Sequence, residues 1–195
     1  MANTNIEKSQ DSNIRVLING MTAVSIEVKN RVTHQNELKW GFTDAENHLV
    51  VEPIYDEVNP FEENGLAMVM LRVDQSKTER FGFINKKGKV ISPIIYEIVW
   101  SFSIACFAKV RKNGKWGFVN ESGEEIIPVI YEFIKPFHMG LAATKCKGKW
   151  GYLDTRGEIH IPFLYDDARN FENGTALVSL GGKYIYIDSS GNKTH

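Results

Sequence analysis

The chain has 195 residues, 43% of them hydrophobic and 24% charged, and 23 Lys and Arg against 24 Asp and Glu give a formal net charge of −1. This composition is typical of a globular protein and excludes global disorder, and the balanced charge argues against a surface dedicated to duplex DNA. The longest apolar run, residues 66–71, is too short to span a membrane, and residues 1–13 are polar and lack a signal-peptide core. We therefore expect a cytoplasmic protein with a disordered tail over residues 1–13.

An internal repeat organises the rest of the chain. An anchor pair, an aromatic residue followed by glycine, recurs as Trp40-Gly41, Phe81-Gly82, Trp116-Gly117 and Trp150-Gly151, with Tyr184-Ile185 as a decayed fifth copy. A tyrosine follows each of the four anchors after fifteen residues, at Tyr55, Tyr96, Tyr131 and Tyr165. A phenylalanine follows after twenty-one, at Phe61, Phe102, Phe137 and Phe171. This register predicts a single repeat domain over residues 14–195, with a partial repeat (14–38), repeats at about 39–79, 80–114, 115–148 and 149–182, and a half repeat (183–195).

Each repeat predicts strands in a fixed order. An anchor strand such as 115–120 is followed by a turn with an Asx residue and, three positions on, a glycine or Asn47, which suits a type I turn closed by a left-handed residue. A second strand then ends near a proline, and a third begins at a small-residue step, where Cys106 replaces glycine and is expected to be small and buried. No segment has a sustained helical period.

The predicted fold class is therefore all-β, an array of antiparallel hairpin or meander repeats of about 34 residues stacked in series. One such repeat cannot bury its aromatic face alone, so neighbours must stack. The N- and C-terminal half repeats could pair and close the array, which would remove exposed strand edges.

The motif Lys-Trp-Gly-Phe, then Asx-x-x-Gly, Ile-Pro-x-x-Tyr-Asp/Glu and Phe-x-x-Gly-x-Ala, resembles the WG repeat family over about residues 39–192. Phe81, Tyr184 and Ile185 depart from the family pattern. The resemblance implies a β-rich, mainly bacterial binding or scaffolding module, with relatives in bacterial conflict systems, and implies no catalytic residues.

Motifs of known catalytic chemistry are absent from the sequence, so we expect no enzyme, no cofactor and no metal site. The two cysteines, Cys106 and Cys146, and the five histidines occupy unrelated repeat positions. A hydrolase with an unrecognised site remains an alternative, and it would require a pocket with His138 or His160 beside a carboxylate.

Charged residues recur beside the landmarks. A carboxylate follows each tyrosine, at Asp56, Glu97, Glu132 and Asp166, and a base precedes each anchor, at Lys39, Arg80, Lys115, Lys149 and Lys183. Because an active site needs one constellation and not one per repeat, we expect these residues to satisfy turns or form surface ion pairs.

Positions that differ between copies are the candidates for function. Ile98, Trp100 and Phe133 stand where other copies are polar, and they predict an exposed apolar patch of the kind found at protein interfaces. The alternative is that a loop or the N-terminal tail covers this patch. The turns before the anchors are basic and would form an edge that steers a protein partner. Lys109, Arg111, Lys112, Lys145 and Lys147 belong to this edge.

These features predict a non-catalytic module that binds another protein, such as an immunity or inhibitor protein that neutralises its partner, and a monomer is favoured. The alternatives are a scaffold or adaptor in a bacterial multiprotein system, a binder of nucleic acid or envelope polymer, and the hydrolase named above.

Overall fold

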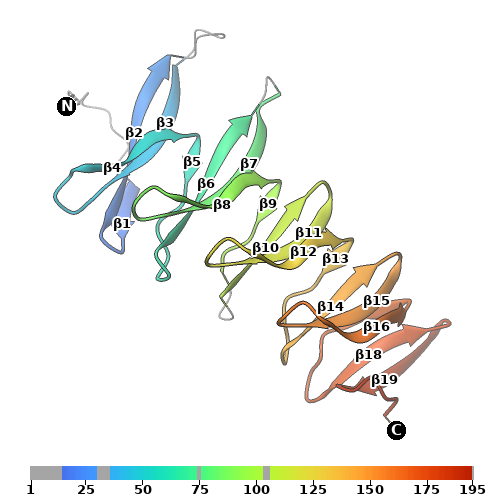
Figure 1. Ribbon diagram of the computed structural model, residues 1–195. Helices are drawn as coiled ribbons and strands as arrows, with labels where there is room; N and C mark the ends of the chain where they lie inside the picture. The colour runs from blue at the N-terminus through green and yellow to red at the C-terminus, as the bar shows by residue number, and fades with distance from the viewer. Residues whose placement is uncertain (1–14, 30–35, 74–75, 103–105, 195) are drawn as a thin grey trace. The chain divides into compact units, whose positions relative to one another are not determined.

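The computed structural model describes residues 15–29, 36–73, 76–102 and 106–194, and all regular elements in these ranges are β-strands (Figure 1). The described residues therefore contain no helix that could cross a membrane. The expected N-terminal tail, residues 1–13, lies outside the described ranges. The chain divides into two compact units, residues 1–96 and 97–195.

The first unit contains two four-stranded antiparallel sheets. The first sheet has the order β1 (Arg15–Ile18), β2 (Met21–Lys29), β3 (Asn36–Thr43) and β4 (Leu49–Tyr55). The second has the order β5 (Glu57–Val58), β6 (Leu66–Val73), β7 (Thr78–Asn85) and β8 (Val90–Tyr96).

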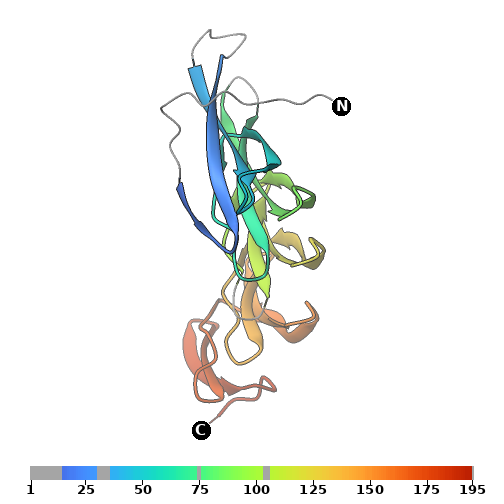
Figure 2. The ribbon, with the colours of Figure 1, turned by 90° about the vertical axis from the view of Figure 1, so that its left-hand side faces the viewer.

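The second unit contains three antiparallel sheets that follow one another in chain order (Figures 1 and 2). The third sheet of the chain has β9 (Ile98–Val99), β10 (Phe107–Lys112), β11 (Lys115–Asn120) and β12 (Glu125–Tyr131). The fourth has β13 (Phe133–Ile134), β14 (Leu141–Cys146), β15 (Lys149–Asp154) and β16 (Ile159–Tyr165). The fifth has β17 (Asp167–Ala168), β18 (Thr175–Leu180) and β19 (Lys183–Asp188).

The structure confirms an all-β array, but its sheets are offset from the sequence repeats. In the third sheet, β9 and β10 end one repeat, whereas β11 and β12 begin the next. The half repeats also contribute strands to sheets that they share with the adjacent repeats. In the N-terminal partial repeat β2 pairs with β1 and with β3, and in the C-terminal half repeat β19 pairs with β18. Closure of the array by the half repeats stays a prediction.

The predicted turns are present in the expected conformations. Asn120 Oδ1 accepts hydrogen bonds from the backbone N–H groups of Ser122 and Glu124, and Gly123 has φ 83°. Asn47 takes the same left-handed conformation with φ 64°, which asparagine tolerates better than most residues. The expectation for Cys106 is wrong, because this residue is exposed. Cys106 has φ 60°, so the position requires a left-handed backbone rather than a small buried side chain.

The glycine of each anchor pair is required by a close backbone approach. A Cβ on Gly117 would lie 2.5 Å from the carbonyl oxygen of Ile127, and a Cβ on Gly151 would lie 2.5 Å from that of Ile161. The decayed fifth copy has Ile185 at this position, and in the described residues the chain after β19 returns to it only through an isolated bridge between Ile187 and Lys193. The absence of a side chain thus lets the second strand cross the anchor strand.

Aromatic packing explains the phenylalanine that follows each anchor. In three copies this ring packs on the aromatic residue two positions after the anchor, with centroid separations of 4.7, 5.3 and 4.8 Å. The pairs are Phe42 with Phe61, Phe118 with Phe137, and Tyr152 with Phe171. Such contacts stabilise each repeat beyond the area that they bury.

The second strands form sheet edges and carry exposed aliphatic side chains. β12 and β16 lie at the edges of their sheets, and each contains a proline, Pro128 or Pro162. The expectation that the second strand ends at this proline is wrong, because both strands continue to the tyrosine. Proline cannot donate to a further strand, so it limits pairing at these edges. Two positions later, Ile130 is 60% exposed and Leu164 57%.

Replacement of an anchor glycine tests the close approach. We expect Gly117→Ala to lower the free energy of unfolding by about 2–3 kcal/mol, since the added methyl group would displace the backbone at Ile127. In Gly148→Ala a Cβ would meet nothing within 4 Å, so only the strain of φ 79° applies, about 1 kcal/mol. Urea denaturation of both variants measures the difference, and equal losses would contradict the steric explanation.

Candidate functional site

In the second unit, a row of contacting aromatic rings extends from the third sheet to the fourth. The ring of Phe133, in β13, contacts Trp116 of β11 and Trp150 of β15 edge-on, with centroid separations of 6.2 and 6.0 Å. Both tryptophans are half-buried, whereas Phe133 is 40% exposed. The anchors therefore form part of a surface that solvent reaches, and sequence reasoning had assigned them to the scaffold alone.

Trp100 extends this row into solvent. It follows β9, its backbone N–H donates to the carbonyl of Lys109 over 2.9 Å, and its side chain is 55% exposed. Ile98 lies opposite Arg111 in the β9–β10 ladder and is half-buried. The alternative that the N-terminal tail covers this patch concerns residues outside the ranges that the structure describes.

The expectation of basic turns is wrong for most of their residues, because Arg111 and Lys112 lie in β10 and Lys145 lies in β14. Lys109 differs most from the expectation. It was expected in a basic turn, yet it lies in β10 and is only 6% exposed. Its Nζ is 4.1 Å from the ring centroid of Trp116, 4.5 Å from that of Phe133 and 5.3 Å from that of Trp100. The faces of these rings attract the ammonium group. Burial nevertheless lowers the pKa of Lys109 to about 8.

The repeat alignment contains a signal that could have found Lys109. The equivalent positions in the other sheets hold Met68, Ala143 and Leu177, so Lys109 is a cation at an otherwise apolar position. None of the ion pairs within the part of the chain that the structure describes involves Lys109.

Arg111 places a second cation on the same tryptophan. Its guanidinium carbon lies 5.7 Å from the centroid of Trp116, and its Nε lies 3.7 Å from a carboxylate oxygen of Glu97. That distance is too long for a hydrogen bond, and the buried Nε has no hydrogen-bond partner in the described ranges. We call Trp100, Lys109, Arg111, Trp116 and Phe133 the aromatic–cationic cluster.

Two of the predicted site residues lie elsewhere. Lys112 ends β10 and lines a shallow hollow of about 420 Å³ that Glu125 and Ile130 also line. Lys147 is exposed in the turn between β14 and β15. The structure thus brings Trp100, Phe133 and Arg111 together, but not Lys112 or Lys147.

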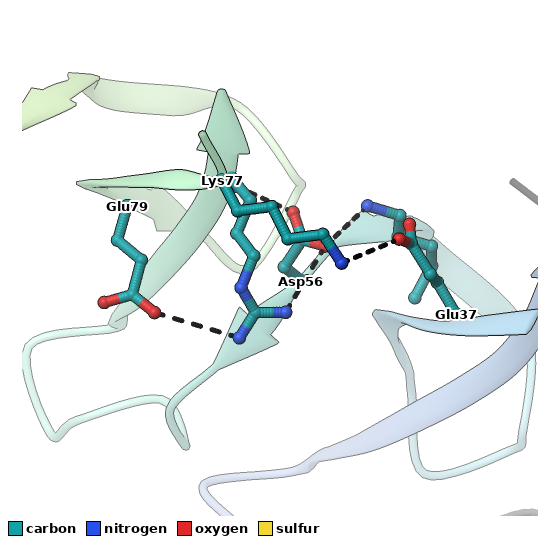
Figure 3. A network of polar contacts seen from close by, with 6 residues as sticks. Glu37, Asp56, Lys77 and Glu79 are labelled. Carbon is teal, nitrogen blue, oxygen red and sulfur yellow. Dashed lines mark hydrogen bonds and ion pairs between the residues drawn. The ribbon is translucent and has the colours of Figure 1, made fainter. Parts of the chain in front are cut away.

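The recurrent carboxylates accept hydrogen bonds from backbone N–H groups or pair with bases, as the repeat pattern predicts. Asp56 Oδ2 accepts a hydrogen bond from the backbone N–H of Arg72 over 2.8 Å, and Oδ1 accepts one from Lys39 Nζ over 2.6 Å (Figure 3). The carboxylates of the other repeats accept hydrogen bonds from backbone N–H groups in the linking turns: Glu97 from Gly114, Glu132 from Gly148 and Asp166 from Gly181. The hydrogen bond from Lys149 also lowers the pKa of Asp166. This row of carboxylates therefore has a structural role.

The histidines of the hydrolase alternative have no carboxylate partner in the described residues. The Nε2 of His160 lies 2.9 Å from the carbonyl oxygen of Ser189, and His138 is exposed. In the turn after β3, Asp44, Glu46 and His48 bring three potential metal ligands within 4.8 Å of one another. Asp44 accepts hydrogen bonds from the backbone N–H groups of Glu46 and His48, as the Asx residues of the other turns do. These hydrogen bonds of the turn account for the position of Asp44.

Comparison with protein families agrees with this architecture. A family model described as "WG containing repeat" matches residues 40–72, 81–116, 116–150 and 150–184, more than half of the chain. The chain belongs to the WG repeat family. No curated protein matches it. The tryptophan and glycine of the WG motif have separate roles here. The glycine lets the second strand approach closely, whereas Trp116 belongs to the aromatic–cationic cluster and Trp150 contacts Phe133 of that cluster.

Removal of the buried ammonium should stabilise this WG-repeat protein. We expect Lys109→Met to raise the free energy of unfolding at pH 7 by about 1–3 kcal/mol, because burial lowers the pKa of Lys109 to about 8. The unfolded chain binds more protons between about pH 8 and 10, so this lysine makes wild-type stability rise with pH there, and the variant lacks that contribution. Urea denaturation across this range measures both effects.

The exposed Lys147→Met is the matched control, with an expected change within about 0.5 kcal/mol. A Lys109→Met protein less stable than the wild type at pH 7 would show that the rings outweigh the desolvation of the ammonium.

Truncation of a recurrent carboxylate should be destabilising. The Asp56 side chain is 4% exposed, so Asp56→Ala leaves Lys39 and the Arg72 N–H without their acceptor, at a cost of about 2–4 kcal/mol. Lys77→Ala removes an exposed ion pair with Glu37 and should cost less than about 1 kcal/mol (Figure 3). Chemical denaturation compares the two variants, and equal effects would argue against the structural role of the carboxylates.

Proposed function

We propose that this protein is a non-catalytic, cytoplasmic binding module that acts through the aromatic–cationic cluster, as an inhibitor or immunity protein that occupies a partner protein. The observation that carries the proposal is the exposure of Trp100, 55%, and Phe133, 40%, beside two cations. Large aromatic residues and arginine dominate the binding energy of protein interfaces.

The contrast between repeats supports this assignment. The positions of Trp100 in the other copies hold Asn59, Lys135 and Arg169, so the repeat fold does not require a tryptophan there. Trp100 and Phe133 lie at the same ammonium group and form an exposed aromatic patch, and such patches mark sites of contact with other molecules. The WG repeat scaffold would then supply a rigid support, and the cluster would supply specificity.

Nucleic acid is the competing ligand class, because it too binds aromatic and cationic side chains. A groove for single strands tracks the backbone with a series of cations. The cluster has two cations, Lys109 and Arg111, and both stand against the single ring of Trp116 rather than in a series. The net charge of −1 also disfavours polyanion binding, so a protein partner fits better.

Affinity capture from a native lysate of the source cells tests the proposal. We expect one stoichiometric protein to co-purify with the tagged wild-type chain and to be lost with Trp100→Ala, which removes a central aromatic anchor. The matched control is Ile130→Ala, which truncates a side chain that is 60% exposed on an edge strand outside the cluster. Retention of the partner by Trp100→Ala, or equal loss with both variants, would refute binding through this surface.

A further inference from the structure

The charges of the aromatic–cationic cluster are not balanced within it. Lys109 has three aromatic rings around its ammonium group and is in none of the ion pairs of the described residues. Arg111 forms a long ion pair with Glu97, with 3.7 Å between its Nε and a carboxylate oxygen, and this buried Nε has no hydrogen-bond partner among the described residues. The unbalanced charge is that of Lys109, which is 6% exposed, because the Arg111 side chain is 38% exposed and paired with Glu97. A buried cation without an anion is unfavourable, and an incoming anion relieves that penalty.

The cluster also provides apolar walls for such an anion. Trp100 and Phe133 are exposed and both lie against the Lys109 ammonium, so a group that packs on these rings comes within reach of its charge. A carboxylate on a short aliphatic stem fits both features, because its methylene groups pack on rings while its oxygens accept hydrogen bonds from lysine and arginine.

From these contacts we infer that the cluster is a docking site for an acidic segment of the partner protein, in which one Asp or Glu side chain inserts between Trp100 and Phe133 and pairs with Lys109 and Arg111. This inference rests on the proposed function and identifies the chemistry of the partner. Lysine at an otherwise apolar position then has a function that Met68, Ala143 and Leu177 do not have in their sheets.

Selection from a random twelve-residue peptide display library on the immobilised full chain tests the inference. We expect the selected peptides to be enriched in Asp and Glu and to bind Lys109→Met about tenfold or more weakly than the wild type. Lys109→Met uses the residue found at the equivalent position of the second sheet, Met68, and is expected to fold. Lys87→Met, in an exposed turn of the first unit, changes the net charge equally and should bind the peptides like the wild type.

Indole N–H resonances locate the binding. The four tryptophans give separate signals, and we expect peptide to shift those of Trp100 and Trp116 while the buried Trp40 of the first unit is unchanged. Peptides without acidic enrichment, equal affinity for Lys109→Met, or shifts confined to other tryptophans would overturn the inference. Binding of a twelve-nucleotide oligo-dT at Trp100 in preference to the peptides would assign the cluster to nucleic acid instead.

The capture experiment separates this inference from the proposed function. Loss of the natural partner with Trp100→Ala but unchanged binding by Lys109→Met would leave the binding module in place and refute the acidic segment. Retention of the partner by both variants would refute the use of this surface altogether.

Discussion

The crossing of the second strand over the anchor glycine is the constraint on which each complete repeat depends. Where the backbone at Ile127 approaches Gly117, the ladder between β11 and β12 shifts register, and the shift brings Tyr131 opposite Trp116. The same register pairs Trp150 with Tyr165 in the next repeat. The fifteen-residue spacing between anchor and tyrosine is therefore a consequence of strand pairing around one missing side chain.

This constraint leaves few positions free to vary. The turns need Asx and left-handed residues, the carboxylates close the linking turns, and the rings of Phe137 and Phe171 fill the interior of their repeats. Variation is then possible on the short strands that follow each tyrosine and on the facing residues of the third strand. Phe133 lies on such a short strand, Trp100 directly follows one, and Lys109 lies on a third strand at a position that is apolar in the other copies. The cluster thus combines these variable residues with the recurrent anchor Trp116.

Much of the fold could be predicted because the repeat multiplies each local signal. The turn after Asn120 and the order of the three predicted strands were correct, since the same Asx and glycine positions recur in the other copies. The short strand after each tyrosine, such as β13, was not predicted. The sharing of each sheet between two repeats was not predicted, because periodicity fixes spacing but not the boundary of a sheet. Cys106 was misjudged because its type indicates burial, whereas its backbone conformation sets the requirement.

The candidate site was predicted in part for a related reason. Comparison of copies found Trp100 and Phe133, because an apolar residue among polar ones is visible in the sequence. Lys109 was hidden by its charged neighbours in the chain, which suggested a solvated turn, although the strand pairing places it opposite the buried Phe118. Burial of a cation depends on neighbouring sheets, and one-dimensional charge patterns do not contain that information.

The offset between sheets and repeats has a consequence for how the chain folds during synthesis. Each described strand pairs with strands next to it in the sequence, so sheet formation requires no distant partner. A sheet can close as soon as the second strand of the following repeat leaves the ribosome. The array can thus assemble vectorially, one sheet for each repeat translated.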